Sequence, residues 1–203
     1  MLGYDAYNLE WGMCGWTSAD NINKKWATLV PSGQTLETTA NALTTTYPFP
    51  EITPHAASVE EAIKLLADEY LTAGVKGVSA DSLYTLLDDG DPANDPFVIS
   101  YLPENNYNAG HIAGSFRFNP GSFGTEELAH LPTDRMIVVV SYIGHIGCQL
   151  TSYLNILGYD ANVLKYGMNS ISADPAVLNN PSTGQPYTYP PPPDYPVVKS
   201  PPF

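Results

Sequence analysis

The chain has 203 residues, enough for one domain with part of a second, and 43% of them are hydrophobic, so a buried core is expected. Its 21 acidic and 8 basic side chains give a net charge of −13, which disfavours nucleic-acid and membrane-surface partners. The sequence contains no apolar run long enough for a membrane span, no signal peptide, and only two cysteines, Cys14 and Cys148, too few for a disulfide framework. It leaves the compartment open between an exported and a cytoplasmic protein.

The first sixteen residues contain half of an internal repeat. Residues 2–16 and 157–171 are identical at eight of fifteen positions. The repeat predicts that residues 1–16 are the closing strand of an incomplete unit, of which a complete copy follows. An isolated strand leaves backbone N–H and C=O groups unpaired. We therefore expect this strand to pair either with an edge of the complete domain or with another chain. The other chain would be a second copy in a homodimer, another protein or a second unit of the same kind.

Residues 17–74 are predicted to be an extended linker followed by a helix. Thr, Asn, Ser and Pro dominate residues 17–54, which favours a segment lying over a surface. Ser58 and Glu61 form a capping box, and Gly74 ends the pattern, so a helix is expected over residues 58–73. Its expected apolar face comprises Val59, Ala62, Ile63, Leu66, Tyr70 and Leu71.

Alternating short strands and helices are expected next. A strand at Val78 precedes a helix over Ala80–Leu87, and an apolar run at Phe97–Tyr101 predicts a buried strand. A turn with the sequence Gly110-His111-Ile112-Ala113-Gly114-Ser115 follows, in which Gly110 and Gly114 supply the backbone freedom that a turn needs. His111 is expected to be a hydrogen-bonded anchor. A short helix is expected over Thr125–His130.

The stretch from Met136 to Ile171 organises the rest of the chain. An apolar run, Met136–Val140, predicts a buried strand, and a helix is expected over Cys148–Leu157, followed by a strand from Ala161. Backbone N–H groups converge where a strand, a tight loop and a helix start meet, which favours anions. The predicted anion-binding loop comprises Ser141, Tyr142, Ile143, Gly144, His145, Ile146 and Gly147.

This stretch and the Gly110–Ser115 turn resemble the rhodanese-like (thiosulfate sulfurtransferase-like) domain family. The resemblance implies an α/β fold, a three-layer α/β/α domain with a mainly parallel central sheet, at residues 75–173. Trp11 to Trp16 is similar to the family's closing signature. In the family, the loop begins with the catalytic cysteine and usually carries arginines. Here Ser141 stands at the nucleophile position, and Ser100-Tyr101-Leu102 replaces the acidic residue and arginine that active members place after an earlier strand.

The resemblance therefore implies a catalytically inactive rhodanese-like domain with a structural, regulatory or binding role. A hydroxyl is far less acidic than a thiol and forms no stable persulfide equivalent. One alternative is a rhodanese-type sulfurtransferase that uses Cys148 or a cysteine in a missing repeat. A second is a small-anion binding protein that uses the loop amides and His145. A hydrolase pair of Ser141 and His145 lacks a third, orienting residue. Neither a metal nor a cofactor is expected.

Residues 174–203 are predicted to be a proline-rich tail. They hold ten of the nineteen prolines, including the run Pro190–Pro193. Such a sequence favours polyproline II conformation. It is expected to lie over a surface or stay disordered, or to serve as a ligand for an aromatic-lined groove.

Overall fold

The computed structural model describes residues 3, 5, 7, 9, 12–19, 31–52, 56–180 and 194–197. The chain forms two compact units, one of residues 1–2 and 31–187, the other of residues 3–30 and 188–203. The described strands, and the described helices from residue 59 onward, all belong to the first unit.

Within the described residues, five parallel strands form one sheet in the order β1-β5-β4-β2-β3. The strands are β1 Gly77–Val78, β2 Phe97–Ser100, β3 Phe116–Arg117, β4 Ile137–Val140 and β5 Ala161–Leu164. The central strand, β4, is fully buried along its length, as its unbroken β-branched sequence predicts for a strand covered on both faces.

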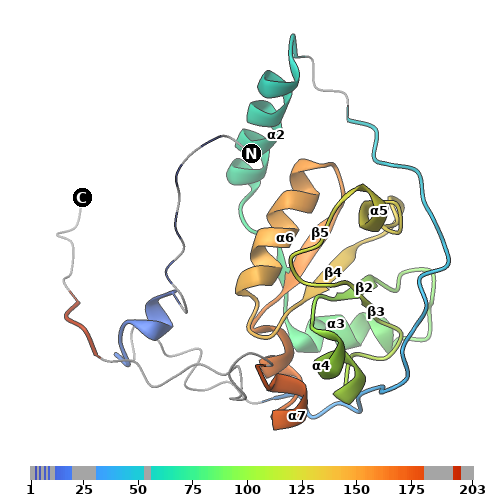
Figure 1. The fold of residues 1–203 in the computed structure, drawn as a ribbon, viewed down its shortest axis with the longest axis vertical. Helices are drawn as coiled ribbons and strands as arrows, with labels where there is room; N and C mark the ends of the chain where they lie inside the picture. Colours follow the sequence, from blue (N-terminus) through green and yellow to red (C-terminus); the bar gives the residue numbers. More distant parts are fainter. Residues whose placement is uncertain are drawn as a thin grey trace. The chain divides into compact units, whose positions relative to one another are not determined.

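Helices cover both faces of the sheet. They are α3 Ala80–Leu87, α4 Glu104–Ala109, α5 Thr125–Leu128 and α6 His145–Ile156. Crossovers between parallel strands are right-handed. The chain crosses the sheet in one direction from β1 to β2 and β3, and then comes back to β4 and β5. The helices of the outward path, α3 and α4, therefore lie on one face, and those of the return path, α5 and α6, lie on the other (Figure 1). The α/β fold with a parallel central sheet is confirmed.

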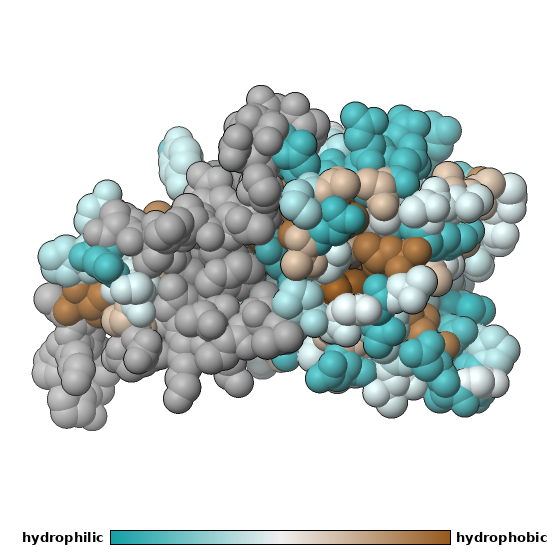
Figure 2. Space-filling model, turned by 90° about the horizontal axis from the view of Figure 1, so that it is seen from below, coloured by the Kyte–Doolittle hydropathy of each residue, from teal (hydrophilic) through white to brown (hydrophobic). Residues whose placement is uncertain are grey.

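The core on the α5 and α6 side is built from alternate strand residues. Ile99, Ile137, Val139 and Ala161 pack there with Leu128 of α5 and with Leu150 and Leu154 of α6. Seen from below, the described surface is mostly hydrophilic or neutral, and hydrophobic residues show as small separate patches (Figure 2).

Helix α2, Val59–Ala73, packs beside α6. The predicted capping holds: Ser58 Oγ accepts a hydrogen bond from Glu61 N at 3.2 Å, and the helix ends at Gly74. The predicted apolar face is only partly correct. Tyr70 is buried and bonded to Ser152 of α6, whereas Val59 and Leu71 are 78% and 71% exposed.

Residues 31–50, the strap, are extended and bonded to several distant parts of the first unit. Ser32 N and Gly33 N donate to the carbonyls of Ser170 and Ile171. Further along, Glu37 pairs with His111, and Asn41 forms a β-bridge with Phe116 of the edge strand β3. The strap therefore protects a sheet edge that would otherwise present unpaired backbone groups.

The other unit combines residues near both chain ends. A 3-10 helix, η1 (Gly12–Gly15), leads to Trp16, whose ring lies 4.9 Å from that of Tyr195. Ser18 donates to the Asp194 carboxylate through its backbone N and its Oγ, at 2.7 and 2.6 Å. The closing strand predicted for residues 1–16, and most of the proline-rich tail, fall largely outside the described residues.

The tail prediction began at residue 174, but the first unit continues beyond that position. A short helix, α7 (Pro175–Leu178), is capped by Asp174 and buries Val177 and Leu178. Among the described helices, none combines the length and the apolar character that crossing a membrane requires.

Candidate functional site

The loop after β4 is shorter than predicted. Helix α6 begins at His145, three residues before the predicted start at Cys148, so only Ser141–Gly144 form the loop. Gly144 precedes the helix with φ 91°, a left-handed conformation that glycine adopts without strain. His145, Ile146 and Gly147 are thus the first turn of the helix. Gly147 lies within this turn although glycine disfavours helix interiors, so the sequence gives little sign that the helix starts before Cys148.

The Ser141 hydroxyl uses the amides of this loop. Its side chain is buried, and Oγ accepts hydrogen bonds from Gly144 N at 3.1 Å and from Gly147 N at 3.2 Å. Gly147 allows this approach because a Cβ there would lie 3.1 Å from Ser141 Oγ and 2.9 Å from Val163 Cγ2. Two of the N–H groups that an anion would require already have an internal acceptor.

The next two loop residues point into the protein. Ile143 and Tyr142 are 6% and 7% exposed. Tyr142 OH donates to Asn106 Oδ1 at 2.7 Å, while Asn106 Nδ2 donates to the carbonyls of Val177 and Asn179 at 3.0 and 2.7 Å. The loop is therefore tied through α4 to the segment around α7.

A second 3-10 helix, η2 (Gly167–Ser170), closes the loop from the other side. Met168 N donates to the Ser141 carbonyl at 2.8 Å, and Asn169 N donates to the Tyr142 carbonyl at 3.1 Å. Gly167 has φ 54°, and a Cβ at this position would overlap the Ser141 carbonyl oxygen. Only glycine fits the space that the loop backbone leaves here.

Two predicted loop residues lie on the outside of the first turn of α6. His145 is half-buried, and Ile146 is 41% exposed. Ile146 lines a pocket of about 320 Å³ beside α6, with Tyr101, Gly121, Phe123, Gln149, Leu150 and Tyr153. This lining is uncharged and includes three aromatic side chains, so the pocket offers no cationic group to an anionic substrate.

Cys148, the alternative nucleophile, is half-buried in α6. Burial raises the pKa of its thiol above the ordinary value. A reactive cysteine has a lowered pKa, because the thiolate is the nucleophile. The environment of Cys148 thus disfavours the reactive form. The side chain of Cys14 is outside the described part of the structure.

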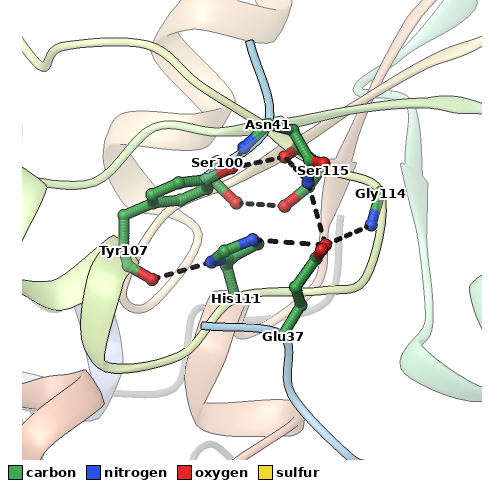
Figure 3. Close-up of polar contacts among 7 residues, drawn as sticks. All are labelled: Glu37, Asn41, Ser100, Tyr107, His111, Gly114 and Ser115. Atoms are coloured by element: carbon green, nitrogen blue, oxygen red, sulfur yellow. Dashed lines mark hydrogen bonds and ion pairs between the residues drawn. The ribbon is translucent and has the colours of Figure 1, made fainter. Parts of the chain in front are cut away.

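The Gly110–Ser115 turn is a separate cluster organised by His111 (Figure 3). The imidazole is fully buried and stacks on Tyr107 with ring centroids 3.6 Å apart, and His111 Nδ1 lies 2.7 Å from the Tyr107 carbonyl oxygen. His111 Nε2 is 3.4 Å from Glu37 Oε2, which also accepts hydrogen bonds from Gly114 N and Asn41 Nδ2.

Gly110 allows a close approach of the strap. A Cβ at Gly110 would lie 2.8 Å from Leu36 Cδ1. The sequence pattern gave no indication of the roles of Glu37, Asn41 and Asn106, because they lie in segments without hydrophobic periodicity. Their polar groups find partners only when distant segments meet.

Residues 79–174 match the family model of the rhodanese-like domain. The chain contains a rhodanese-like domain. Such a domain indicates a sulfurtransferase-related or a binding role. The match covers the Gly110–Ser115 turn, the Ser141–Gly144 loop and η2.

Two solved structures are similar to the chain. SSP1007 from Staphylococcus saprophyticus is 15% identical, with a TM-score of 0.44, over 48% of this chain and 94% of the other. The reduced CoADR-RHD of Bacillus anthracis is 19% identical, with a TM-score of 0.43, over 65% of this chain and 22% of the other. No curated protein matches the chain.

Proposed function

We propose that this rhodanese-like domain is catalytically silent at the Ser141 loop and serves a structural, regulatory or binding role. The observation that carries the proposal is that the loop's own side chain occupies two of its amides, since the buried Ser141 Oγ accepts hydrogen bonds from both Gly144 N and Gly147 N. Sulfur transfer requires a thiolate that attacks sulfane sulfur and holds it as a persulfide, which a serine hydroxyl does not do.

The rigidity of the loop also supports this proposal. Its two leading carbonyls are bonded to η2, and Tyr142 is anchored at Asn106. An incoming substrate would have to displace these internal contacts and desolvate itself. A loop with this packing stabilises the fold rather than presenting a reactive centre.

The two alternatives have less support. A sulfurtransferase that uses Cys148 would need a lowered thiol pKa, and burial raises it. Small-anion binding at the loop would need amides that Ser141 Oγ already occupies. A cysteine supplied by another rhodanese-like unit would leave both observations unchanged.

For the partner, we propose another protein or a second rhodanese-like unit. The repeat of residues 2–16 at 157–171 supports a tandem relationship. A homodimer through the N-terminal strand stays a prediction, because most of that segment lies outside the described residues.

The proposal is tested by thiosulfate sulfurtransferase activity of the full chain beside Ser141→Cys and Cys148→Ala, with intact mass spectrometry to detect an added sulfur atom. We expect no turnover and no persulfide in the parent chain or in Cys148→Ala. Ser141→Cys is the positive control for persulfide detection, because its sulfur would face the same two amides. Turnover by the parent that disappears in Cys148→Ala would show that the nucleophile is Cys148 and overturn the proposal.

A further inference from the structure

The two 3-10 helices, η1 and η2, occupy corresponding positions of the internal repeat. Gly12 and Gly167 are 155 residues apart, begin the two helices, and both have φ 54°. Trp16 N donates to the Met13 carbonyl at 3.1 Å, and Ile171 N donates to that of Met168 at 3.0 Å. The sequence repeat is thus also a repeat of backbone conformation.

The next backbone bonds correspond as well. Thr17 N also donates to the Met13 carbonyl, at 3.2 Å, just as Ser172 N donates to that of Met168, at 2.9 Å. Trp16 O accepts a hydrogen bond from Tyr195 N at 2.9 Å, while Ile171 O accepts one from Gly33 N at 3.1 Å. The segment around Tyr195 therefore pairs with the first copy as the strap pairs with the second.

The surroundings of the two helices differ. Met168 is 0% exposed, and its N–H binds the Ser141 carbonyl. Met13, its counterpart, is 44% exposed. A Cβ at Gly167 would strike the loop backbone, whereas no described atom, chain neighbours aside, lies within 4 Å of a Cβ at Gly12. The backbone of η1 thus has the conformation with which η2 holds the loop after β4, but no described loop lies against Gly12.

We propose that η1 docks on a second rhodanese-like unit, at the central strand of that unit, the loop that follows the strand and the helix that follows the loop. Met13 N and Cys14 N donate to the first two carbonyls of the loop after that unit's central strand, Gly12 leaves room for the loop backbone, and the Met13 side chain becomes buried. The inference rests on the second-unit partner proposed above. It is independent of the sulfur-transfer assay, because η1 does not contain Ser141.

The test provides η1 with a second unit of known sequence. Residues 31–156, here called the added body, are fused directly in front of Leu2 of the full chain. Residues 2–16 then follow Ile156 as residues 157–171 do in the native chain. Oxidation by hydrogen peroxide is then followed at Met13 and Met168 by peptide mass mapping, since exposed methionines oxidise faster than buried ones. Limited proteolysis reports whether the added body is folded.

We expect Met13 to oxidise quickly in the unfused chain and about tenfold more slowly in the fusion, with Met168 protected in both. Gly12→Ala in the fusion should restore fast oxidation of Met13, because the methyl group blocks the loop. Gly90→Ala is the matched control, because Gly90 also has a positive φ with free space around it and lies in neither η1 nor η2. This control should leave Met13 protected.

Two outcomes would overturn the inference. In one, the added body resists protease while Met13 oxidises as fast as in the unfused chain, which would mean that the body folds without η1. In the other, the added body is digested as an unfolded chain, which would mean that η1 cannot complete it.

Discussion

Glu37 is joined to His111 through both backbone and side chain. The two residues exchange N–H···O bonds of 2.9 Å in each direction, and Glu37 Oε2 lies 3.4 Å from the buried His111 Nε2 (Figure 3). Seventy-four positions separate them, so this pairing fixes the strap on the turn that the family model recognises.

The Glu37 carboxylate should make stability depend on pH. The hydrogen bond from Gly114 N, followed by that from Asn41, holds its pKa below the ordinary 4.5. Because the folded-state pKa is lowered, its stabilisation is complete above pH 4.5 and is lost as the pH falls through the folded value. We expect Glu37→Gln to weaken the fall in the free energy of unfolding at acid pH, measured by urea denaturation. Glu37→Ala should lower that free energy by about 2 kcal/mol at neutral pH. An unchanged acid limb in Glu37→Gln would contradict this assignment.

Gly167→Ala should be among the most damaging small substitutions. The added methyl group combines a positive φ with overlap of the Ser141 carbonyl, and we expect a loss of about 3 kcal/mol or more in the free energy of unfolding. Gly90→Ala separates the two effects, because its φ is also positive but its Cβ meets free space. It should cost only about 1 kcal/mol. Equal losses in the two variants would mean that the loop backbone does not press on Gly167.

Tyr142→Phe should destabilise the loop by leaving Asn106 Oδ1 buried without its donor, at a cost of about 1–3 kcal/mol. Tyr84→Phe is the matched comparison. The Tyr84 hydroxyl is buried without a hydrogen-bond partner among the described residues, and burial raises its pKa to about 12. Its removal should be neutral or slightly stabilising. Chemical denaturation of both variants gives the answer, and the reverse order of stabilities would show that the Tyr142 hydroxyl is not an anchor.

Cys148 should react slowly with iodoacetamide at pH 8. Its pKa is raised by burial, so less thiolate is present than in an unperturbed cysteine. Peptide mass mapping of the alkylated chain distinguishes Cys148 from Cys14, and the same chain unfolded in urea provides the reference rate. If Cys148 in the folded protein is alkylated as fast as in the urea-unfolded chain, or faster, it is again a candidate nucleophile.

Local sequence determined the elements and their order. The apolar run at Ile137–Val140 became a central strand, Ser58 and Ser79 capped the helices predicted after them, and Gly158 followed the end of α6. These features depend on side-chain pattern and on caps that act within a few residues. The parallel sheet and the rhodanese-like domain were instead predicted from the resemblance of the Gly110–Ser115 turn and the Met136–Ile171 stretch to that family, and both are confirmed.

The state of the candidate site was decided by tertiary contacts. Ser141 could be identified from the sequence, but the capture of two amides by its hydroxyl depends on the backbone path through Gly144 and Gly147. The start of α6 was misplaced for the same reason, since this capping does not follow a standard local pattern.

Long-range contacts set the remaining roles. Glu37, Asn106 and Gly167 contact residues far away in the chain. The Glu37 carboxylate and the Asn106 amide interact with side chains of other segments, and Gly167 leaves room for another segment because it has no side chain. Residue types and spacing determined which elements form. Only the folded chain determined which polar groups and which glycine meet, because hydrogen bonds and close contacts between distant segments leave no periodic signal in the sequence.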